Sequence, residues 1–396
     1  MKKKICFVIQ RYGKEVNGGA ELLCREMAEH LSRYFDVSVM TSKARDYITW
    51  KNEYTANEEV INGIHVYRFS AVQERDRAKT DSLSAVFRKD VCGDEKKEME
   101  WLIAQGPYCP DLVEALRKEK DTYDAFIFFT YLYWPTVAGL PEVAEKAILV
   151  PTAHDEQYIF MKSLRRIFRE CAGIIYLTDT ERRLCERLFQ NGDVPHVVGG
   201  CGIEVPAVMN PRITREKYNL GNYITYVGRV DEGKMVPVLL KYFEEYTKRH
   251  NNGLKLVLCG RESIRIKKSE HVVSLGYVSE QEKYDVMAGA LCLVLPSRYE
   301  SLSMVVLEAM ALKVPAVVNG ACEVTKEHCI QSNGGLYYSD YYEFEGILDR
   351  LQNRPQERKE IGLCGQRYVQ EQYSWDTVIK QIRGLIESSC IIRVKR

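Results

Sequence analysis

The chain has 396 residues, of which 45% are hydrophobic and 28% charged, and its formal net charge is +1. At roughly 150 residues per domain, this length predicts two or three domains with hydrophobic cores of their own. A nearly neutral chain without interleaved aromatic and basic residues is not typical of nucleic-acid-binding proteins, so we exclude that class.

The chain is expected to be cytoplasmic, because the apolar run in the opening "MKKKICFVIQ" is too short for a signal peptide. It contains no run of about 18 apolar residues that could cross a membrane. The 13 cysteines are scattered without a CxxC pair, which argues against a disulfide framework and a zinc knuckle and favours buried, reduced thiols.

The first forty residues are predicted to form a strand, a loop with Gly18 and Gly19, a helix from Ala20 to about Tyr34, and a second strand. Four more apolar runs follow, each predicted to be a strand: "DAFIFFTY", "KAILVPTAH", "GIIYLTD" and "HVVGG". Strands that alternate with helical segments predict a parallel sheet that helices cover on both faces. The charged, helix-prone segment 73–120 interrupts this alternation, and we interpret it as an inserted helical subdomain.

After Glu204 the pattern starts again, with a domain boundary expected between Val205 and Arg215. Six strands are predicted, "NYITYVGRV", "LKLVLCG", "HVVSLGYV", "LCLVLPS", "VPAVVN" and "GGLYY", and they alternate with helical stretches. The fold class is therefore α/β with two doubly wound domains. The closing segment 375–396 is predicted to be a helix whose apolar side packs back toward the first domain.

Ligands bind outside the carboxyl ends of strands in open α/β sheets, so the residues that follow each strand are the candidates for a site. Gly18 and Gly19 allow close approach of the backbone, and the helix after them offers N–H groups to an anion; a structural turn is the alternative. His154 also follows a strand, although many such histidines are structural. The seven histidines show no helical pair, so no metal site is predicted.

A second pair of strand ends carries more charge. Arg229 and Lys234 lie on the loop "GRVDEGK", where two cations beside a helix start form an anion clamp; a solvated basic loop is the alternative. Glu300 follows the strand "LCLVLPS". The N–H groups of the next helix start point to the same side, and they belong to Ser301, Leu302, Ser303 and Met304.

Glu308 is the only ionisable residue between Ser301 and Leu312. It lies in a helix with a core-facing apolar stripe formed by Leu302, Val305, Val306, Ala309 and Met310. A buried carboxylate needs a partner, and nothing nearby in the sequence supplies one.

Together these motifs resemble glycosyltransferase family 4, the retaining transferases with the GT-B fold. The similarity rests on "NGGAE", "TAHDE", "VGRVDEGK", "LGYVSEQEKYDVMAGA", "PSRYESLSMVVLEAMA" and "SWDTV", and it extends over nearly the whole chain. It implies two Rossmann-like domains that face a central cleft. Their expected ranges are 1–205, with the insert at about 73–120, then 206–374, with 375–396 as a C-terminal helix.

The resemblance also implies roles for the candidate residues. Arg229 and Lys234 would bind the donor diphosphate, and Glu308 would accept hydrogen bonds from the ribose, so that its partner is the ligand. Glu300 would orient the transferred sugar and His154 would contact it near the reacting centre. Further donor contacts are implied for Gly18 and Gly19 at the phosphates and for Tyr277 and Val278 at the base.

The expected activity is that of a metal-independent, retaining hexosyltransferase. It would move a sugar from a nucleotide-sugar donor, with UDP or GDP as the nucleotide, to a glycan or lipid-linked acceptor in polysaccharide or glycoconjugate synthesis. No separate cofactor is expected. Two alternatives stay open, a nucleotide-sugar 2-epimerase of the same fold and a non-catalytic sugar-binding subunit. Ser301, Leu302 and Ser303 replace the glycine-rich sequence that is common in the family, which leaves the donor sugar open.

One more segment, "FMKSLRRIFREC", places basic residues at helical spacing opposite an apolar side. The basic residues are Lys162, Arg165, Arg166 and Arg169. A solvated helix face explains them, and contact with an anionic membrane surface or with a lipid pyrophosphate acceptor is the alternative.

Overall fold

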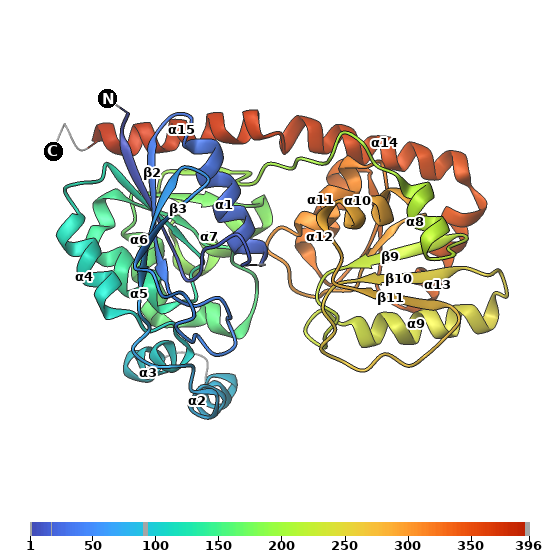
Figure 1. The fold of residues 1–396 in the computed structure, drawn as a ribbon, viewed down its shortest axis with the longest axis horizontal. Helices are drawn as coiled ribbons and strands as arrows, with labels where there is room; N and C mark the ends of the chain where they lie inside the picture. The colour runs from blue at the N-terminus through green and yellow to red at the C-terminus, as the bar shows by residue number, and fades with distance from the viewer. Residues whose placement is uncertain (1, 17, 90–93, 393–396) are drawn as a thin grey trace. The chain divides into compact units, whose positions relative to one another are not determined.

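A computed structural model describes residues 2–16, 18–89 and 94–392 (Figure 1). The chain divides into two compact units, which we call unit 1 (Met1–Cys201 with Asp376–Arg396) and unit 2 (Gly202–Trp375). The chain therefore passes from one unit to the other twice, and the second passage lies at the start of the last helix.

Unit 1 is built on an eight-stranded sheet in the order β3-β4-β2-β1-β5-β6-β7-β8. Every neighbouring pair is parallel except β3 and β4, which form an antiparallel hairpin at the edge. The strands are β1 Lys4–Ile9, β2 Asp36–Ser42, β3 Glu58–Ile61, β4 Ile64–Phe69, β5 Ala125–Phe129, β6 Ala147–Val150, β7 Gly173–Tyr176 and β8 His196–Val198.

Strands β5 and β6 of unit 1 are apolar along their whole length. All five residues of β5, Ala-Phe-Ile-Phe-Phe, are buried, as expected for a parallel sheet with helices on both faces. The helices of this unit include α1 Gly19–Leu31, α4 Pro110–Glu119, α5 Trp134–Gly139, α6 Arg165–Arg169, α7 Asp179–Phe189 and α15 Trp375–Ile392. The carboxyl ends of the parallel strands consequently lie along one edge of the sheet.

The segment 73–120 contains α2 Arg77–Lys89, α3 Glu95–Gln105 and α4. Helices α2 and α3 pack on each other and on the short 3-10 helices η2 Gln157–Phe160 and η3 Lys162–Leu164. By contrast, α4 packs against β2 and α5. The added element is therefore the α2–α3 hairpin, whereas α4 is a crossover helix of the sheet.

Unit 2 has a six-stranded, fully parallel sheet in the order β11-β10-β9-β12-β13-β14. Its strands are β9 Tyr223–Val227, β10 Lys255–Cys259, β11 Val272–Gly276, β12 Leu293–Leu295, β13 Ala316–Asn319 and β14 Gly335–Tyr338. Its helices are α8 Pro211–Lys217, α9 Val236–Arg249, α10 Glu280–Gly289, α11 Met304–Ala311, α12 Glu323–Ser332, α13 Tyr341–Asn353 and α14 Pro355–Gln372. Strands β9 and β12 are neighbours, so the loops that follow them lie side by side.

The last helix, α15, belongs to unit 1 from Asp376 onward. Its residues Val378, Ile382 and Ile386 are fully buried, and the Ser389 hydroxyl donates a hydrogen bond of 3.5 Å to the Ala172 carbonyl oxygen.

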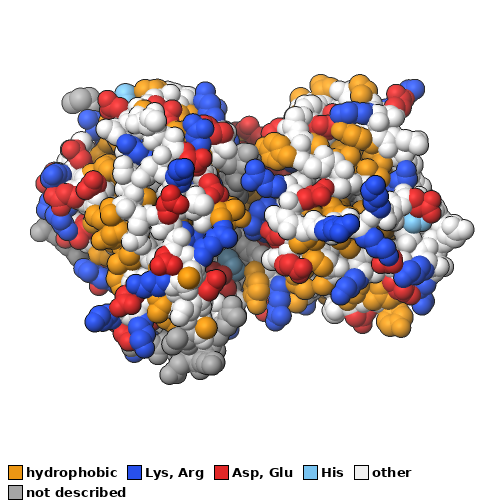
Figure 2. All heavy atoms as spheres, turned by 60° about the horizontal axis from the view of Figure 1, so that its bottom comes forward, with side chains coloured by type: hydrophobic (Ala, Val, Ile, Leu, Met, Phe, Trp, Pro, Cys, Tyr) orange, Lys and Arg blue, Asp and Glu red, His pale blue; other side chains and the backbone are white. Residues whose placement is uncertain are grey.

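On the face that Figure 2 shows, Lys and Arg side chains are mixed with Asp and Glu on both units, in keeping with the net charge of +1.

Candidate functional site

The loops after β9 and β12 bring two predicted site residues into contact in unit 2. Lys234 Nζ lies 2.6 Å from Glu300 Oε1, and both side chains are mostly buried. The backbone N–H of Lys234 donates to Asp231, whose carboxylate also pairs with Arg229 at 3.0 Å. The Tyr226 hydroxyl donates to the Arg229 carbonyl oxygen at 2.6 Å. This loop is therefore fixed at both ends, and the side chain of Arg229 is about half exposed (53%).

Glu308 is buried, as its apolar helix predicts. The expectation that its only partner is a ligand is wrong, because Lys283 Nζ and the Tyr284 hydroxyl both lie 3.0 Å from its Oε1. Burial opposes the charge on Lys283, but Glu308 and Glu280 together raise its pKa. The protein thus supplies a counter-charge from α10, and both contacts are made to the same carboxylate oxygen of Glu308.

The start of α11 is held in an unusual conformation. Ser303 precedes the helix with φ of 66°, a left-handed conformation that a serine adopts only when its surroundings impose it. The hydroxyl oxygens of Ser297 and Ser303 are buried, and neither has a hydrogen-bond partner within the described residues. Two such hydroxyls beside the free N–H groups of a helix start indicate a site for an anionic or polar ligand.

His328 holds the loop before α11 through its imidazole ring. Its Nε2 lies 3.0 Å from the Leu302 carbonyl oxygen and its Nδ1 lies 3.1 Å from the Tyr368 hydroxyl. Burial lowers the pKa of His328 to about 4, so the ring is neutral at neutral pH. A neutral ring can donate to Leu302 and accept from Tyr368 at the same time.

Tyr277 and Val278 follow β11, at the edge of the sheet of unit 2. Tyr277 is 73% exposed, whereas Val278 packs partly against the core. These two residues lead directly into α10, which carries Lys283 and Tyr284. They therefore belong to the segment that leads into the contacts with Glu308.

Gly18 and Gly19 differ sharply in their surroundings in unit 1. A Cβ atom on Gly18 would lie 2.1 Å from Glu21 Oε2, whereas one on Gly19 would meet nothing within 4 Å. Gly18 is therefore required by the buried Arg11–Glu21 ion pair, in which Arg11 Nη2 lies 2.6 Å from Glu21 Oε1. Only Gly19 keeps open space for the close approach that its position predicts.

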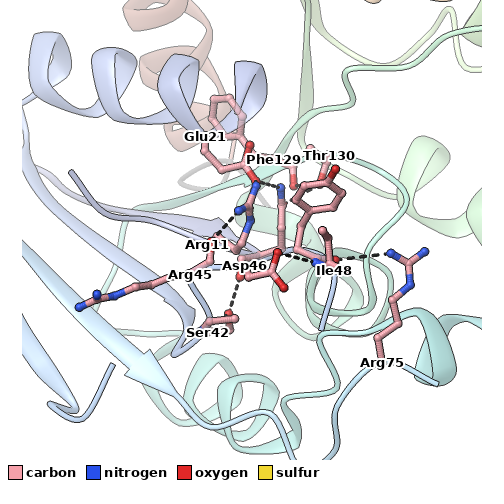
Figure 3. A network of polar contacts seen from close by, with 12 residues as sticks. Arg11, Glu21, Ser42, Arg45, Asp46, Ile48, Arg75, Phe129 and Thr130 are labelled. Atoms are coloured by element: carbon pink, nitrogen blue, oxygen red, sulfur yellow. Dashed lines mark hydrogen bonds and ion pairs between the residues drawn. The ribbon is translucent and has the colours of Figure 1, made fainter. Parts of the chain in front are cut away.

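A buried polar network surrounds this ion pair at the carboxyl ends of β1, β2 and β5 (Figure 3). The Gln10 amide donates to Glu21 at 3.0 Å and its side-chain oxygen accepts from Thr130 at 3.0 Å. The Ser42 hydroxyl donates to the Gln10 carbonyl oxygen at 2.6 Å. The network links the ends of three neighbouring strands, so this edge of the sheet is polar and its side chains are held in place by hydrogen bonds.

His154 follows β6 and lies beside a second carboxylate cluster. Its Nε2 is 3.4 Å from Glu156 Oε2, and the Tyr131 hydroxyl donates to Glu156 at 2.5 Å. Burial alone would raise the pKa of Glu156, but the hydrogen bonds from His154 and Tyr131 hold it below its usual value. The negative charge on Glu156 therefore orients the imidazole.

Glu181 fixes the loop that carries His154. Its carboxylate accepts backbone N–H groups from Ala153 and Leu177, which follow β6 and β7. Burial raises the pKa of Glu181 to about 8, against the lowering effect of these N–H groups.

The sequence predictions missed the polar residues that contact the candidate residues or fix their loops within each unit. They are Gln10, Arg11, Glu21, Glu156, Glu181, Lys283 and Tyr284. Most follow a strand or open a helix, as the charged letters of "VIQRYG" and "SEQEKYD" do, so their positions carried a signal even though their pairings did not.

No group of three or more His, Cys, Asp or Glu side chains is arranged to hold a metal ion in the part of the chain that the structure describes. Among the same residues, no helix combines the length and the apolar character needed to span a bilayer.

Comparison with known proteins gives a consistent picture. Residues 212–363 match the family described as Glycosyl transferases group 1. An uncharacterized glycosyltransferase of Methanocaldococcus jannaschii is 30% identical over 171 residues, which are 40% of this chain and 43% of that protein. An alpha-1,3/1,6-mannosyltransferase of Mus musculus is 29% identical over 114 residues, which are 28% of this chain and 27% of that protein. The chain thus spans less than half the length of these curated relatives.

Solved structures match over nearly the full chain. A sucrose-phosphate synthase from Thermosynechococcus elongatus has a TM-score of 0.73 at 17% identity, covering 98% of this chain and 99% of that one. HepE of Anabaena, solved with UDP and glucose, has a TM-score of 0.70 at 16% identity, covering 98% of this chain and 100% of that one. The protein therefore has the GT-B fold, and its residues 212–363 are similar to the group 1 glycosyl transferases.

Proposed function

We propose that this protein is a retaining hexosyltransferase that moves a sugar from a UDP- or GDP-sugar to a glycan or lipid-linked acceptor. The observation that carries the proposal is the Lys234–Glu300 ion pair at the start of α11, inside the region that matches the group 1 glycosyl transferases. A lysine held by a carboxylate beside a helix start can exchange that partner for a diphosphate without a change of fold.

The residues of unit 2 divide the donor between them in this proposal. Lys234 and Arg229 neutralise the diphosphate together with the N–H groups of Ser303 and Met304. Glu308, which is held by its ion pair with Lys283, accepts hydrogen bonds from the ribose hydroxyls. Glu300 orients the transferred sugar.

The chemical step then requires little from the protein beyond electrostatics. The acceptor hydroxyl attacks on the face that the nucleotide leaves, and the departing phosphate takes the proton, so no side chain acts as general base. Charge develops on the leaving phosphate, where Lys234, Arg229 and the start of α11 stabilise it. In unit 1, His154 contacts the sugar. Glu156 orients the His154 ring, and Glu181 holds the loop that carries it.

The proposal is tested by incubating the protein with UDP-, GDP- and ADP-sugars, with and without glycan acceptors, and measuring free nucleotide and the anomeric form of the product by NMR. A retaining transferase releases nucleotide faster with acceptor and gives a product with the donor's anomeric configuration. A 2-epimerase would instead yield the 2-epimer of the donor sugar, and a non-catalytic subunit would bind nucleotide without turnover.

Two variants sharpen this test. Lys234→Ala removes most turnover, whereas Lys241→Ala, on the exposed side of α9, leaves it unchanged. Glu300→Gln lowers turnover more than nucleotide affinity. Equal activity of the Lys234 and Lys241 variants would refute the assignment of the donor site.

A peripheral membrane contact through Lys162, Arg165, Arg166 and Arg169 is also part of the proposal. These four residues are exposed. The apolar side of the same segment, Leu164, Ile167 and Phe168, is fully buried in the core of unit 1. The segment therefore has no apolar side to insert into lipid, and the contact we propose is purely electrostatic.

A further inference from the structure

The α2–α3 hairpin is attached at the carboxyl edge of the sheet in unit 1. The backbone N–H of Arg75, just before α2, donates to the Thr49 carbonyl oxygen at 2.8 Å. At the other end of the hairpin, Trp50 Nε1 donates to the Gln105 carbonyl oxygen at 2.6 Å. Both ends are therefore tied to the loop that follows β2, at the edge where ligands of open α/β sheets bind.

Arg75 has fewer acceptors than its guanidinium can use. Nη2 donates to the side-chain oxygen of Gln105 at 2.5 Å and Nη1 donates to the Tyr47 carbonyl oxygen at 3.4 Å. Nε is buried and has no partner within the described residues. A guanidinium has five N–H donors, so most of those of Arg75 have no acceptor in the part of the chain that the structure describes. Both acceptors that are present are uncharged.

Two other arginines at the same edge of the sheet, Arg11 and Arg68, are each paired with a carboxylate. Arg11 donates two hydrogen bonds to the Glu21 carboxylate and a third to the Arg45 carbonyl oxygen. Arg68 is paired with Glu59 through Nε and Nη2. Arg75 has no carboxylate partner among residues 2–16, 18–89 and 94–392, so its charge is not neutralised in the same way.

The neighbourhood of Arg75 is the polar edge already described. Burial raises the pKa of Tyr133 to about 12, and the charges of Glu21, Arg11, Arg75 and Glu156 also act on it. The ring of Tyr133 packs edge-on against Trp50, with the ring centroids 5.4 Å apart, and Trp50 is the residue that holds Gln105 at the end of the hairpin. Figure 3 shows the side chain of Arg75 directed toward the loop at Asp46 and Ile48, beside this network.

We propose that Arg75 binds an anionic group of the acceptor, a phosphate or a carboxylate, and that the α2–α3 hairpin serves to position this arginine. This inference rests on the proposed function, because it assigns the acceptor side of that same transferase. An arginine with unused, fork-shaped donors matches the two oxygens of a carboxylate or phosphate.

The first experiment tests the anion site without knowledge of the acceptor. The full-length protein, saturated with UDP so that the donor site is filled, is titrated with inorganic phosphate by 31P NMR, and Arg75→Gln is compared with Arg77→Gln. Arg77 is exposed and lies two residues further on, so both changes remove the same charge. We expect the wild type and Arg77→Gln to bind phosphate equally and Arg75→Gln to bind it roughly 10- to 150-fold more weakly.

The second experiment identifies the source of the anion. Transfer is measured to hexose 6-phosphates, to glucuronate, to neutral hexoses and to a lipid-linked phosphate in vesicles. For the anionic acceptor that binds to Arg75, we expect kcat/KM to fall in Arg75→Gln and to recover in part in Arg75→Lys. Donor hydrolysis without acceptor should stay unchanged in both variants.

The outcomes separate this inference from the proposed function. Equal phosphate affinity in the two glutamine variants, no phosphate binding by the wild type, or preference for neutral acceptors would overturn the role of Arg75 even with an active transferase. Absence of donor turnover in the wild type would count against the proposed function, while the phosphate titration, repeated without UDP, would still decide whether Arg75 holds an anion. If Arg75 has a structural role alone, Arg75→Gln lowers the melting temperature and leaves the phosphate affinity intact.

Discussion

Glu308 shows how a single buried charge is accommodated in an apolar helix. Lys283 and Tyr284 both contact one carboxylate oxygen, so the side chain has a counter-charge and a hydrogen-bond donor within the protein before any ligand binds. The pair therefore prepares an acceptor whose orientation is fixed in advance, and its remaining capacity is available for the ribose hydroxyls that we propose as partners.

We predict that Glu308→Gln weakens UDP binding by roughly 10- to 150-fold, because it removes a charge-assisted acceptor worth about 1.5 to 3 kcal/mol. Isothermal titration calorimetry measures the effect. Glu280→Gln is the matched control, since Glu280 is the other carboxylate partner of Lys283, at 2.7 Å, and is exposed. Equal affinities of the two variants for UDP would show that Glu308 has only a structural role.

His328 makes the stability of the protein depend on pH. Its pKa is about 4 in the folded chain and about 6.5 when unfolded. Above pH 6.5 the ring is neutral in both states and its contribution is complete. As the pH falls from 6.5 to 4, only the unfolded chain takes up the proton, so the free energy of unfolding decreases by about 3 kcal/mol in total.

We predict that His328→Gln flattens this part of the pH dependence while the rest of the profile is retained. Urea denaturation between pH 4 and pH 7 measures it, and His271→Gln, a change at a histidine outside the core, serves as the control. Identical slopes in wild type and His328→Gln between pH 4 and 6.5 would contradict the assignment.

At the scale of elements, α15 stabilises the unit that lies earliest in the chain. Leu385 is 5% exposed, and its Cδ1 lies 3.2 Å from the position that a Cβ on Gly173 would occupy. Helix α15 and strand β7 are therefore in close contact at Gly173, where no side chain separates them. The C-terminal helix thus completes the hydrophobic core of unit 1.

We predict that Leu385→Ala destabilises unit 1 by about 2 to 5 kcal/mol, because it leaves a cavity beside β7. Lys380→Ala, on the exposed side of the same helix, should change the free energy of unfolding by less than about 0.5 kcal/mol. Hydrogen exchange followed by mass spectrometry measures each unit separately. Loss of protection in unit 2 instead of unit 1 would contradict the packing of this helix.

The basic segment at η3 and α6 gives a second prediction at this scale. Arg165→Glu with Arg166→Glu should abolish sedimentation with anionic vesicles at low salt and leave donor hydrolysis unchanged, since the contact we propose is electrostatic. Arg212→Glu with Lys248→Glu, the same change of charge at exposed sites in unit 2, is the control. If both double variants bind vesicles like the wild type, the segment is only a solvated surface.

At the scale of the whole molecule, the protein carries out its proposed chemistry with fixed charges. Arg229 and Lys234 supply two positive charges, and the start of α11 adds the equivalent of roughly half a charge. In this structure Arg229 is paired with Asp231 and Lys234 with Glu300, so we propose that both exchange these partners for the diphosphate and offset its charge in place of a divalent cation.

We predict that transfer survives excess EDTA, and that the double variant Arg229→Ala, Lys234→Ala loses more turnover than Lys234→Ala alone. Nucleotide release with and without the chelator measures the first point, and circular dichroism checks that the variants fold. Loss of activity in EDTA that Mg²⁺ or Mn²⁺ restores would show that a cation carries charge that we assign to these side chains.

The sequence by itself determined the repeated strand and helix pattern of the two units, because a fully buried parallel strand such as β5 reads as one apolar run. It also placed Arg229, Lys234 and Glu300 at strand ends, where position depends only on local pattern. It could have revealed the β3–β4 hairpin, since Asn62 and Gly63, both with positive φ, form the turn that such a pair predicts, but the short strands around them were missed.

Only the tertiary structure decided which of these side chains meet. Lys234 and Glu300 are 66 residues apart and Glu308 and Lys283 are 25 apart; each pair forms because strand order and helix packing bring the two segments together. Spacing along the chain holds no information on strand order in a parallel sheet, where every connection is a crossover. For the same reason the sequence could not show that Arg75 lies among the strand ends of unit 1, nor that Glu308 has a partner within the protein.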